Sequence, residues 1–286
     1  MAGSGFTTQL RTALLLAGLS GLIVAVGALI GGAALPLFVV LAVVMNMGAY
    51  WFSDKVALKA SHAQPLSQAD APQLYQDISE LTGRAGLPMP RVYLIPSDQP
   101  NAFATGRNAK HAAVAVTQGL LTLMPRDQVR GVLAHELAHV RNHDILVTSI
   151  AATLGAVVVW IANMLQFSMF FGGSDEDQNP LAMIATIILA PVAAMLIQLG
   201  ISRQREYLAD ATGARFLGDP EPLASALESL ERATERIPMN ANPATASLYI
   251  ADPFKALHGR GMASLFSTHP PLEERVRRLR AMRSFA

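Results

Sequence analysis

Residues 125–144 read PRDQVRGVLAHELAHVRNHD, and this stretch decides most of what the chain can be. Its apolar residues recur at the spacing of one helical face, after a proline that a first helical turn accepts. Because His135 and His139 lie four residues apart, a helix places both imidazoles on one side, where they can reach one metal ion. Glu136 is displaced around the helix and can act as a general base on a metal-bound water. The stretch therefore predicts a helix with two metal ligands and a base.

A catalytic zinc site also needs a third protein ligand and an open position for water. Residues 205–210 read REYLAD, in which Glu206 and Asp210 are four residues apart on a helical pattern, so both can face one site. We assign Glu206 as the third ligand. Asp210 is expected to accept the free ring N–H of a ligating histidine and so fix its tautomer. The alternative is a solvated face on which these acids pair with Arg203 or Arg205.

The composition points to a membrane protein. The chain has 286 residues, of which 51% are hydrophobic and 15% are charged, whereas a soluble domain carries about a quarter charged residues. There are no cysteines, which excludes disulfides, thiolate zinc sites and cysteine nucleophiles. The net charge of +1 is not gathered into a basic stripe, so we expect no nucleic-acid partner.

Four apolar stretches are long enough to cross a bilayer, for which about twenty residues suffice. They lie at about 10–30, 35–52, 145–171 and 181–201. We interpret them as two helical hairpins. Two alternatives stay open: the first stretch could be a cleaved signal peptide, and the fourth, which contains Pro191 and Gln198, could be a helix buried in protein.

The basic residues near the span ends predict the orientation. They all fall on one side, and neither short connecting loop contains Lys or Arg, which assigns that side to the cytoplasm. Both termini and both long polar segments then share one compartment. The expected organisation is an N-terminal transmembrane hairpin, the first part of a catalytic domain, a second transmembrane hairpin and the second part of that domain, at 1–53, 54–144, 145–201 and 202–286.

The polar segment before the metal helix has a small α+β pattern. Residues 70–86 carry helix signals, with Pro72 near the start and glycines near the end. Residues 91–96 and 112–117 are short β-branched runs that predict a small hairpin or sheet. The expected fold class is therefore mainly α with a small β-sheet, together with about four transmembrane helices.

Together, the HELAH motif at 135–139, the Glu206-x-x-x-Asp210 pair, the two apolar hairpins and the STHPP motif at 267–271 resemble the HtpX family of membrane zinc metalloproteases. The resemblance covers nearly the whole chain. It implies a zincin-like catalytic domain related to the CAAX prenyl endopeptidases, with one zinc ion per chain. It also implies location in the bacterial cytoplasmic (inner) membrane and cleavage of membrane or misfolded proteins in stress-linked quality control. Such proteins and the lipid bilayer would be its partners, and its oligomeric state stays open.

The same resemblance suggests roles for two further segments. It places His269 near the catalytic centre, where it could donate to the tetrahedral oxyanion; the alternative is a cap before a helix at 271–283. It also makes residues 101–106 an edge strand beside the metal helix, where backbone groups could pair with an extended substrate. A simple turn is the alternative there. The residues concerned are Asn101, Ala102 and Phe103.

His143 continues the ligand face of the predicted helix by another four residues. A fourth protein ligand would close the position that water must occupy, so we expect His143 to support the site or meet the membrane surface. Residues 237–263 could form a mobile flap over the cleft or a disordered loop. The last helix carries five arginines that either contact anionic headgroups or form a solvated face: Arg275, Arg277, Arg278, Arg280 and Arg283.

The function predicted from these features is zinc-dependent endopeptidase activity. Zinc held by His135, His139 and Glu206 would polarise a water, and Glu136 would take its proton and later protonate the leaving amine. The alternative is a non-enzymatic membrane protein that binds or senses a metal. A transporter would carry ionisable residues deep inside its spans, and the four apolar stretches have almost none.

Overall fold

The computed structural model describes residues 35–153, 203–242, 245–257 and 270–282, together with a few helical residues between 13 and 28. The predictions that concern the fourth apolar stretch, His269 and most of the first and third stretches lie outside these residues. The part that is described is mainly helical with a small mixed sheet, as the sequence predicts.

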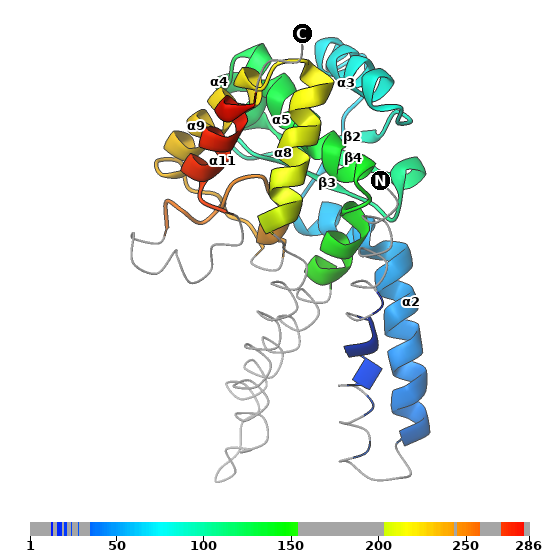
Figure 1. The fold of residues 1–286 in the computed structure, drawn as a ribbon. Helices are drawn as coiled ribbons and strands as arrows, with labels where there is room; N and C mark the ends of the chain where they lie inside the picture. Colours follow the sequence, from blue (N-terminus) through cyan, green and yellow to red (C-terminus); the bar gives the residue numbers. More distant parts are fainter. Residues whose placement is uncertain are drawn as a thin grey trace.

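Helix α2 (Leu35–Ala60) extends from the domain formed by the other described elements as a long single helix (Figure 1). Within the described residues it is long and apolar enough to cross a membrane. Its 26 residues at about 1.5 Å each give about 39 Å, more than the hydrocarbon thickness of about 30 Å. The extra length explains why α2 continues past the predicted span end at 52: its last turns bury Ala57 and Leu58 against the sheet. The Asn46 amide donates to Ser20 Oγ at 2.6 Å, which joins α2 to the helical residues before it.

Four strands form one sheet in the order β1-β2-β4-β3. They are β1 (Gln64–Pro65), β2 (Arg91–Ile95), β3 (Ala102–Thr105) and β4 (Ala113–Thr117). The two predicted strands, β2 and β4, pair in parallel, with Val92 opposite Val114. Of the two arrangements predicted for them, the sheet is confirmed and the hairpin is wrong. Two adjacent parallel strands cannot be joined by a tight turn and need a crossover connection. Here β3 and the following 3₁₀ turn form that connection. β3 lies antiparallel to β4 at the edge.

Three helices lie close to the positions predicted near 70–86, 125–144 and 271–283. α3 begins at Pro72 and ends at Ala85, where Gly86 adopts the left-handed conformation (φ 65°) that a C-terminal glycine allows. α5 covers Arg126–Arg141 and holds the HELAH motif. The remaining helical elements are η1 (Ala109–His111), α4 (Gln118–Leu123), α8 (Arg203–Leu217), α9 (Glu221–Thr234), η2 (Ala246–Leu248) and α11 (Leu272–Ala281).

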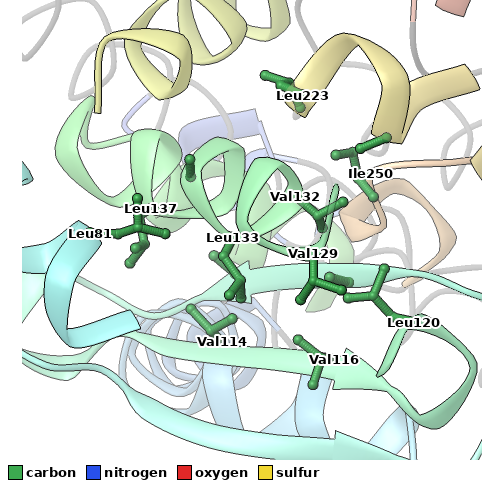
Figure 2. Close-up of a cluster of buried hydrophobic side chains, with 14 of the residues drawn as sticks. Leu81, Val114, Val116, Leu120, Val129, Val132, Leu133, Leu137, Leu223 and Ile250 are labelled. Carbon is green, nitrogen blue, oxygen red and sulfur yellow. The ribbon is translucent and has the colours of Figure 1, made fainter. Parts of the chain in front are cut away.

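The sheet is buried on both faces, and β4 shows the alternation directly. Val114 and Val116 face the main core below α5, where Leu133 points toward the sheet (Figure 2). Ala113 and Ala115 face the opposite side, against the end of α2 and Tyr249. The long apolar helix α2 is therefore anchored to the sheet through its last turns.

Two glycines let α5 approach its neighbours closely. A Cβ on Gly131 would lie 2.6 Å from the carbonyl oxygen of Pro222, where α9 begins. A Cβ on Gly213 of α8 would lie 3.0 Å from backbone atoms of Ala134 and His135. α8 therefore packs backbone to backbone on α5 beside the first metal ligand, which fixes the distance between the two helices.

Candidate metal centre

Three side chains converge where α8 begins to cross α5. His135 and His139 lie one turn apart on α5, and Glu206 lies in the first turn of α8. The two Nε2 atoms are 3.1 Å apart. Glu206 Oε2 is 3.6 Å from the Nε2 of His135, and its Oε1 is 3.5 Å from the Nε2 of His139. The spacing of the sequence motif and the close packing of the helices thus bring three donor atoms together.

This arrangement fits a zinc ion. Bonds of about 2.0–2.1 Å in a tetrahedral site place neighbouring donor atoms about 3.4 Å apart, which agrees with the separations between these three side chains. Two imidazole nitrogens and one carboxylate oxygen, with a fourth position left for water, form a donor set that suits catalytic zinc. A divalent cation would also offset the negative charge of the buried carboxylates around the site.

Both histidines are held so that Nε2 faces the other donors. Asp210 Oδ1 lies 2.9 Å from Nδ1 of His135, and Asp144 Oδ2 lies 3.4 Å from Nδ1 of His139. A ring whose Nδ1–H donates to a carboxylate keeps the lone pair on Nε2 for a metal. Burial and Arg275 lower the pKa of His135, but Asp210 and Glu206 outweigh them and hold that pKa above its ordinary value.

Asp210 is itself held by a buried arginine. Arg275 of α11 is fully buried and donates to both carboxylate oxygens of Asp210, from Nε at 2.8 Å and from Nη2 at 2.7 Å. Burial alone would raise the pKa of Asp210, yet the charge and hydrogen bonds of Arg275 lower it to about 2. A bidentate pair of this kind fixes orientation as well as charge. Arg275 therefore holds the carboxylate that orients His135.

Glu136 occupies the position expected of a base. Its side chain is buried, and its carboxylate accepts a hydrogen bond from the backbone N–H of Ala104 on β3. Burial is the main cause that raises the pKa of Glu136 to about 8, and the nearby Glu206 adds to it. The side chain thus lies between the edge strand and the donor atoms, where it can exchange a proton with a bound molecule.

His143 does not continue the ligand face, because α5 ends at Arg141. His143 has φ 63°, its N–H donates to Val140 O at 3.3 Å, and the N–H of Asp144 donates to His139 O at 3.0 Å. These bonds form the Schellman motif, in which a left-handed residue ends a helix. The turn brings Asp144, rather than His143, to the ring of His139.

A strap of the chain covers the centre. The strap, residues 245–257, includes η2 and lies along β3, where Ile250 N–H donates to Ala102 O at 3.1 Å. The Asn101 amide donates to Ala251 O at 2.9 Å, and Phe103 stacks edge-on against Tyr249 with ring centroids 5.2 Å apart. Only about 20 Å³ of free volume remains beside the donor atoms, in a cavity lined by the site and by strap residues. The predicted substrate strand is thus occupied by the protein's own backbone.

Two supporting residues were missed from the sequence. Arg275 was grouped with the other arginines of the last helix, yet it lies on the apolar stripe formed by Leu272, Val276 and Leu279. That spacing of three and four residues was a usable signal, because a charge on the buried face needs a buried partner. Asp144 gave no such signal, since its place beside His139 depends on how α5 ends.

The sequence and the fold were compared with those of known proteins. The profile of Peptidase family M48 matches residues 68–283. The "Protease HtpX homolog" of Syntrophobacter fumaroxidans is 57% identical over 283 residues, covering 96% of this chain and 99% of that protein. The one of Pelotomaculum thermopropionicum is 50% identical over 280 residues, covering 96% of this chain and 99% of that protein. The crystal structure of S. mikatae Ste24p has a similar fold, with a TM-score of 0.51 and 20% identity over 98% of this chain and 67% of that chain.

Proposed function

The chain belongs to Peptidase family M48, and we propose that this membrane-bound metalloendopeptidase uses one zinc ion, held by His135, His139 and Glu206, to cleave membrane or misfolded proteins. The resemblance to the HtpX family is confirmed, and with it the prediction of a metalloprotease that hydrolyses peptide bonds. The alternative of a non-enzymatic metal-binding protein is not favoured. We also propose that the metal is zinc, that the membrane is the bacterial inner membrane and that the protein acts in stress-linked quality control.

The observation that carries the proposal is the convergence of three donor atoms next to a buried carboxylate. When bound, zinc would supply a Lewis acid that acidifies a water molecule and polarises the scissile carbonyl. Glu136, which adjoins the donors without being one of them, takes the proton of the attacking water and delivers it to the leaving amine. Asp210 and Asp144 keep the lone pair of each Nε2 directed at the metal position. His269 stays a prediction for the oxyanion donor.

Substrate access follows from the strap. We infer that an extended peptide pairs with β3 along Asn101, Ala102 and Phe103 once the strap has left this edge. The hydrogen bond from Ile250 to Ala102 occupies a backbone acceptor that a substrate strand would use. A cavity of about 20 Å³ holds about one water molecule, so a peptide cannot enter while the strap stays in place. The side chain of Phe103 is fully buried and takes no part in this pairing.

Proteolysis by the full-length protein in detergent tests the proposal. The Glu136→Gln variant, loaded with zinc to the same content as wild type, should cleave an unfolded test protein about 10²–10⁴-fold more slowly. The matched control is Glu80→Gln. Glu80 lies on α3 and pairs with Arg130 near the start of α5, far from the donor atoms, so this variant should cleave at the wild-type rate. Equal rates for wild type and Glu136→Gln would mean that the metal has a structural or regulatory role.

Cytoplasmic orientation of the catalytic domain can be tested separately. The chain contains no cysteine, so a single Ser79→Cys substitution on the exposed side of α3 gives one labelling position. We expect a membrane-impermeant maleimide to label this position in inverted inner-membrane vesicles and to leave it unlabelled in intact spheroplasts. The reverse pattern would contradict the orientation derived from the basic residues.

A further inference from the structure

A second pocket opens where α2 meets the sheet, beside the start of β2 and the connection from β3 to β4. Its cavity measures about 530 Å³, within the range of about 300–1,000 Å³ that is common for ligand sites. Aromatic and basic side chains from α2, from β2 and from the β3–β4 connection line it. We call it the basic pocket and define it by Trp51, Phe52, Lys55, Arg91, Arg107 and Lys110.

The position of the basic pocket along α2 places it at the membrane surface. The apolar part of α2, from Leu35 to Phe52, is about 27 Å long at 1.5 Å per residue, close to the hydrocarbon thickness of about 30 Å. One face of this stretch exposes large apolar side chains, and the exposed run ends with Trp51 and Phe52. Aromatic residues settle at the headgroup level. Lys55 follows one turn later, so the pocket faces the depth at which lipid phosphates lie.

Among the described residues, three cations in the basic pocket have no acidic partner. Arg91 is neutralised by Asp54, whose Oδ2 lies 2.6 Å from its Nη2. Lys55, Arg107 and Lys110 form no ion pair with any carboxylate in the part of the chain that is described. The pocket therefore carries an excess of positive charge next to the anionic surface that such membranes present.

The aromatic residues hold two of these cations in place. The guanidinium carbon of Arg107 lies 4.7 Å from the ring centroid of Trp51, and Lys55 Nζ lies 5.2 Å from that of Phe52. Both distances are typical of cation–π contacts. The cations are thus drawn toward the wall of the pocket that meets the bilayer, and their remaining donors can reach a ligand.

The loop that carries Arg107 and Lys110 is shaped before any ligand binds. Gly106 has φ 141°, and a Cβ there would lie 2.5 Å from the carbonyl oxygen of His111. The side chain of Asn108 accepts from the backbone N–H of His111 at 3.1 Å and closes the turn η1. Because the loop is closed in this way, binding loses little conformational entropy.

From these observations we propose that the basic pocket binds the phosphate of an anionic phospholipid headgroup. The three unpaired cations bind the phosphate, and Trp51 and Phe52 contact the upper part of the acyl chains. The loop joins β3 to β4, so the bound lipid fixes the edge strand of the metal centre relative to the bilayer. This surface differs from the last helix, in which Arg275, Arg278 and Arg280 pair with acidic side chains within the domain.

Trp51 provides a local probe for the test. The chain has two tryptophans, so Trp160→Phe leaves Trp51 alone in the full-length protein. Its quenching by brominated phosphatidylglycerol is compared with quenching by brominated phosphatidylcholine in mixed bilayers, each normalised to unquenched intensity. We expect a clear preference for phosphatidylglycerol. The triple variant Lys55→Gln, Arg107→Gln, Lys110→Gln should lower this preference roughly tenfold.

The matched control removes three cations close to the spans but outside the pocket: Lys59→Gln, Arg141→Gln and Arg203→Gln. It should keep the preference. An equal loss in both triple variants would overturn the proposal in favour of a general surface charge. If inorganic phosphate at millimolar concentration removes the preference in wild type, the ligand is a soluble phosphate and the lipid assignment fails.

A second variant tests the proposal even if the triple variant does not fold. Lys55→Glu with Lys110→Glu changes two exposed side chains and should make phosphatidylcholine the preferred lipid. Unchanged preference in this variant, with thermal unfolding like that of wild type, would also overturn the proposal. The readout is lipid binding alone, so its outcome is independent of the zinc site and of proteolysis.

Discussion

The two ends of α5 hold clusters made of the same kinds of side chain, and they do different things. Near its start, Arg126 and Arg130 pair with Asp77 and Glu80 of α3. Each carboxylate there pairs with two arginines, since Arg84 also contacts Glu80, and the side chain of Arg126 is 52% exposed while that of Asp77 is 3% exposed. Near its end, carboxylates outnumber the guanidinium of Arg275, whose side chain is 0% exposed. A partly exposed cluster in which arginines neutralise every carboxylate joins two helices, whereas a buried cluster with excess negative charge is suited to a divalent cation.

The largest effect is expected from breaking the buried pair at the metal end. Arg275→Met leaves the charge of Asp210 buried without its partner, which should lower the free energy of unfolding by about 3–5 kcal/mol. Thermal unfolding in detergent, with zinc removed, measures it. Adding Asp210→Leu should recover most of the stability, because it removes the uncompensated charge. A single variant as stable as wild type would show that this pair is not the anchor of the centre.

Asp210→Asn tests the orientation of a ligand with a side chain of the same size. An amide at this position no longer favours the Nδ1–H tautomer of His135, so zinc affinity should fall about 10–100-fold. Competition with a chelator of known affinity measures the change. If zinc affinity is unaltered, the 2.9 Å contact between Asp210 and His135 does not set the tautomer.

Asp77→Asn makes the same change at the other end of α5. It should cost about 1–2 kcal/mol in unfolding, between the values for exposed and buried pairs. Zinc affinity and proteolysis should stay at the wild-type level, because no metal donor contacts this cluster. A tenfold loss of zinc affinity here would contradict the division of α5 into a packing end and a chemical end.

The smallest effect is expected where α5 stops. His143→Gly places a glycine at the left-handed position of the C-terminal turn and should leave zinc affinity unchanged while adding up to about 1 kcal/mol of stability. Calorimetric zinc titration alongside thermal unfolding checks both. Weaker zinc binding in this variant would mean that the imidazole of His143 itself supports the site.

Local periodicity predicted the helices well, because each amphipathic face is coded within a few turns. The HELAH spacing placed the rings of His135 and His139 side by side for the same reason. The parallel pairing of β2 with β4 could not be found this way, since it depends on partners distant in sequence. Glu206 and Asp210 share one turn of α8, so only the approach of α8 to α5 had to be inferred. Arg275 was missed because the neighbouring arginines concealed its place on the buried stripe.

The account rests on one zinc ion at His135, His139 and Glu206. The most direct measurement is metal analysis of the full-length protein, combined with X-ray absorption at the zinc edge, for wild type and Glu206→Ala. We predict one zinc per chain with two imidazoles and oxygen ligands at about 2.0–2.1 Å, and a loss of bound zinc in the variant. An unchanged zinc content and spectrum in Glu206→Ala would place the metal elsewhere and contradict the account.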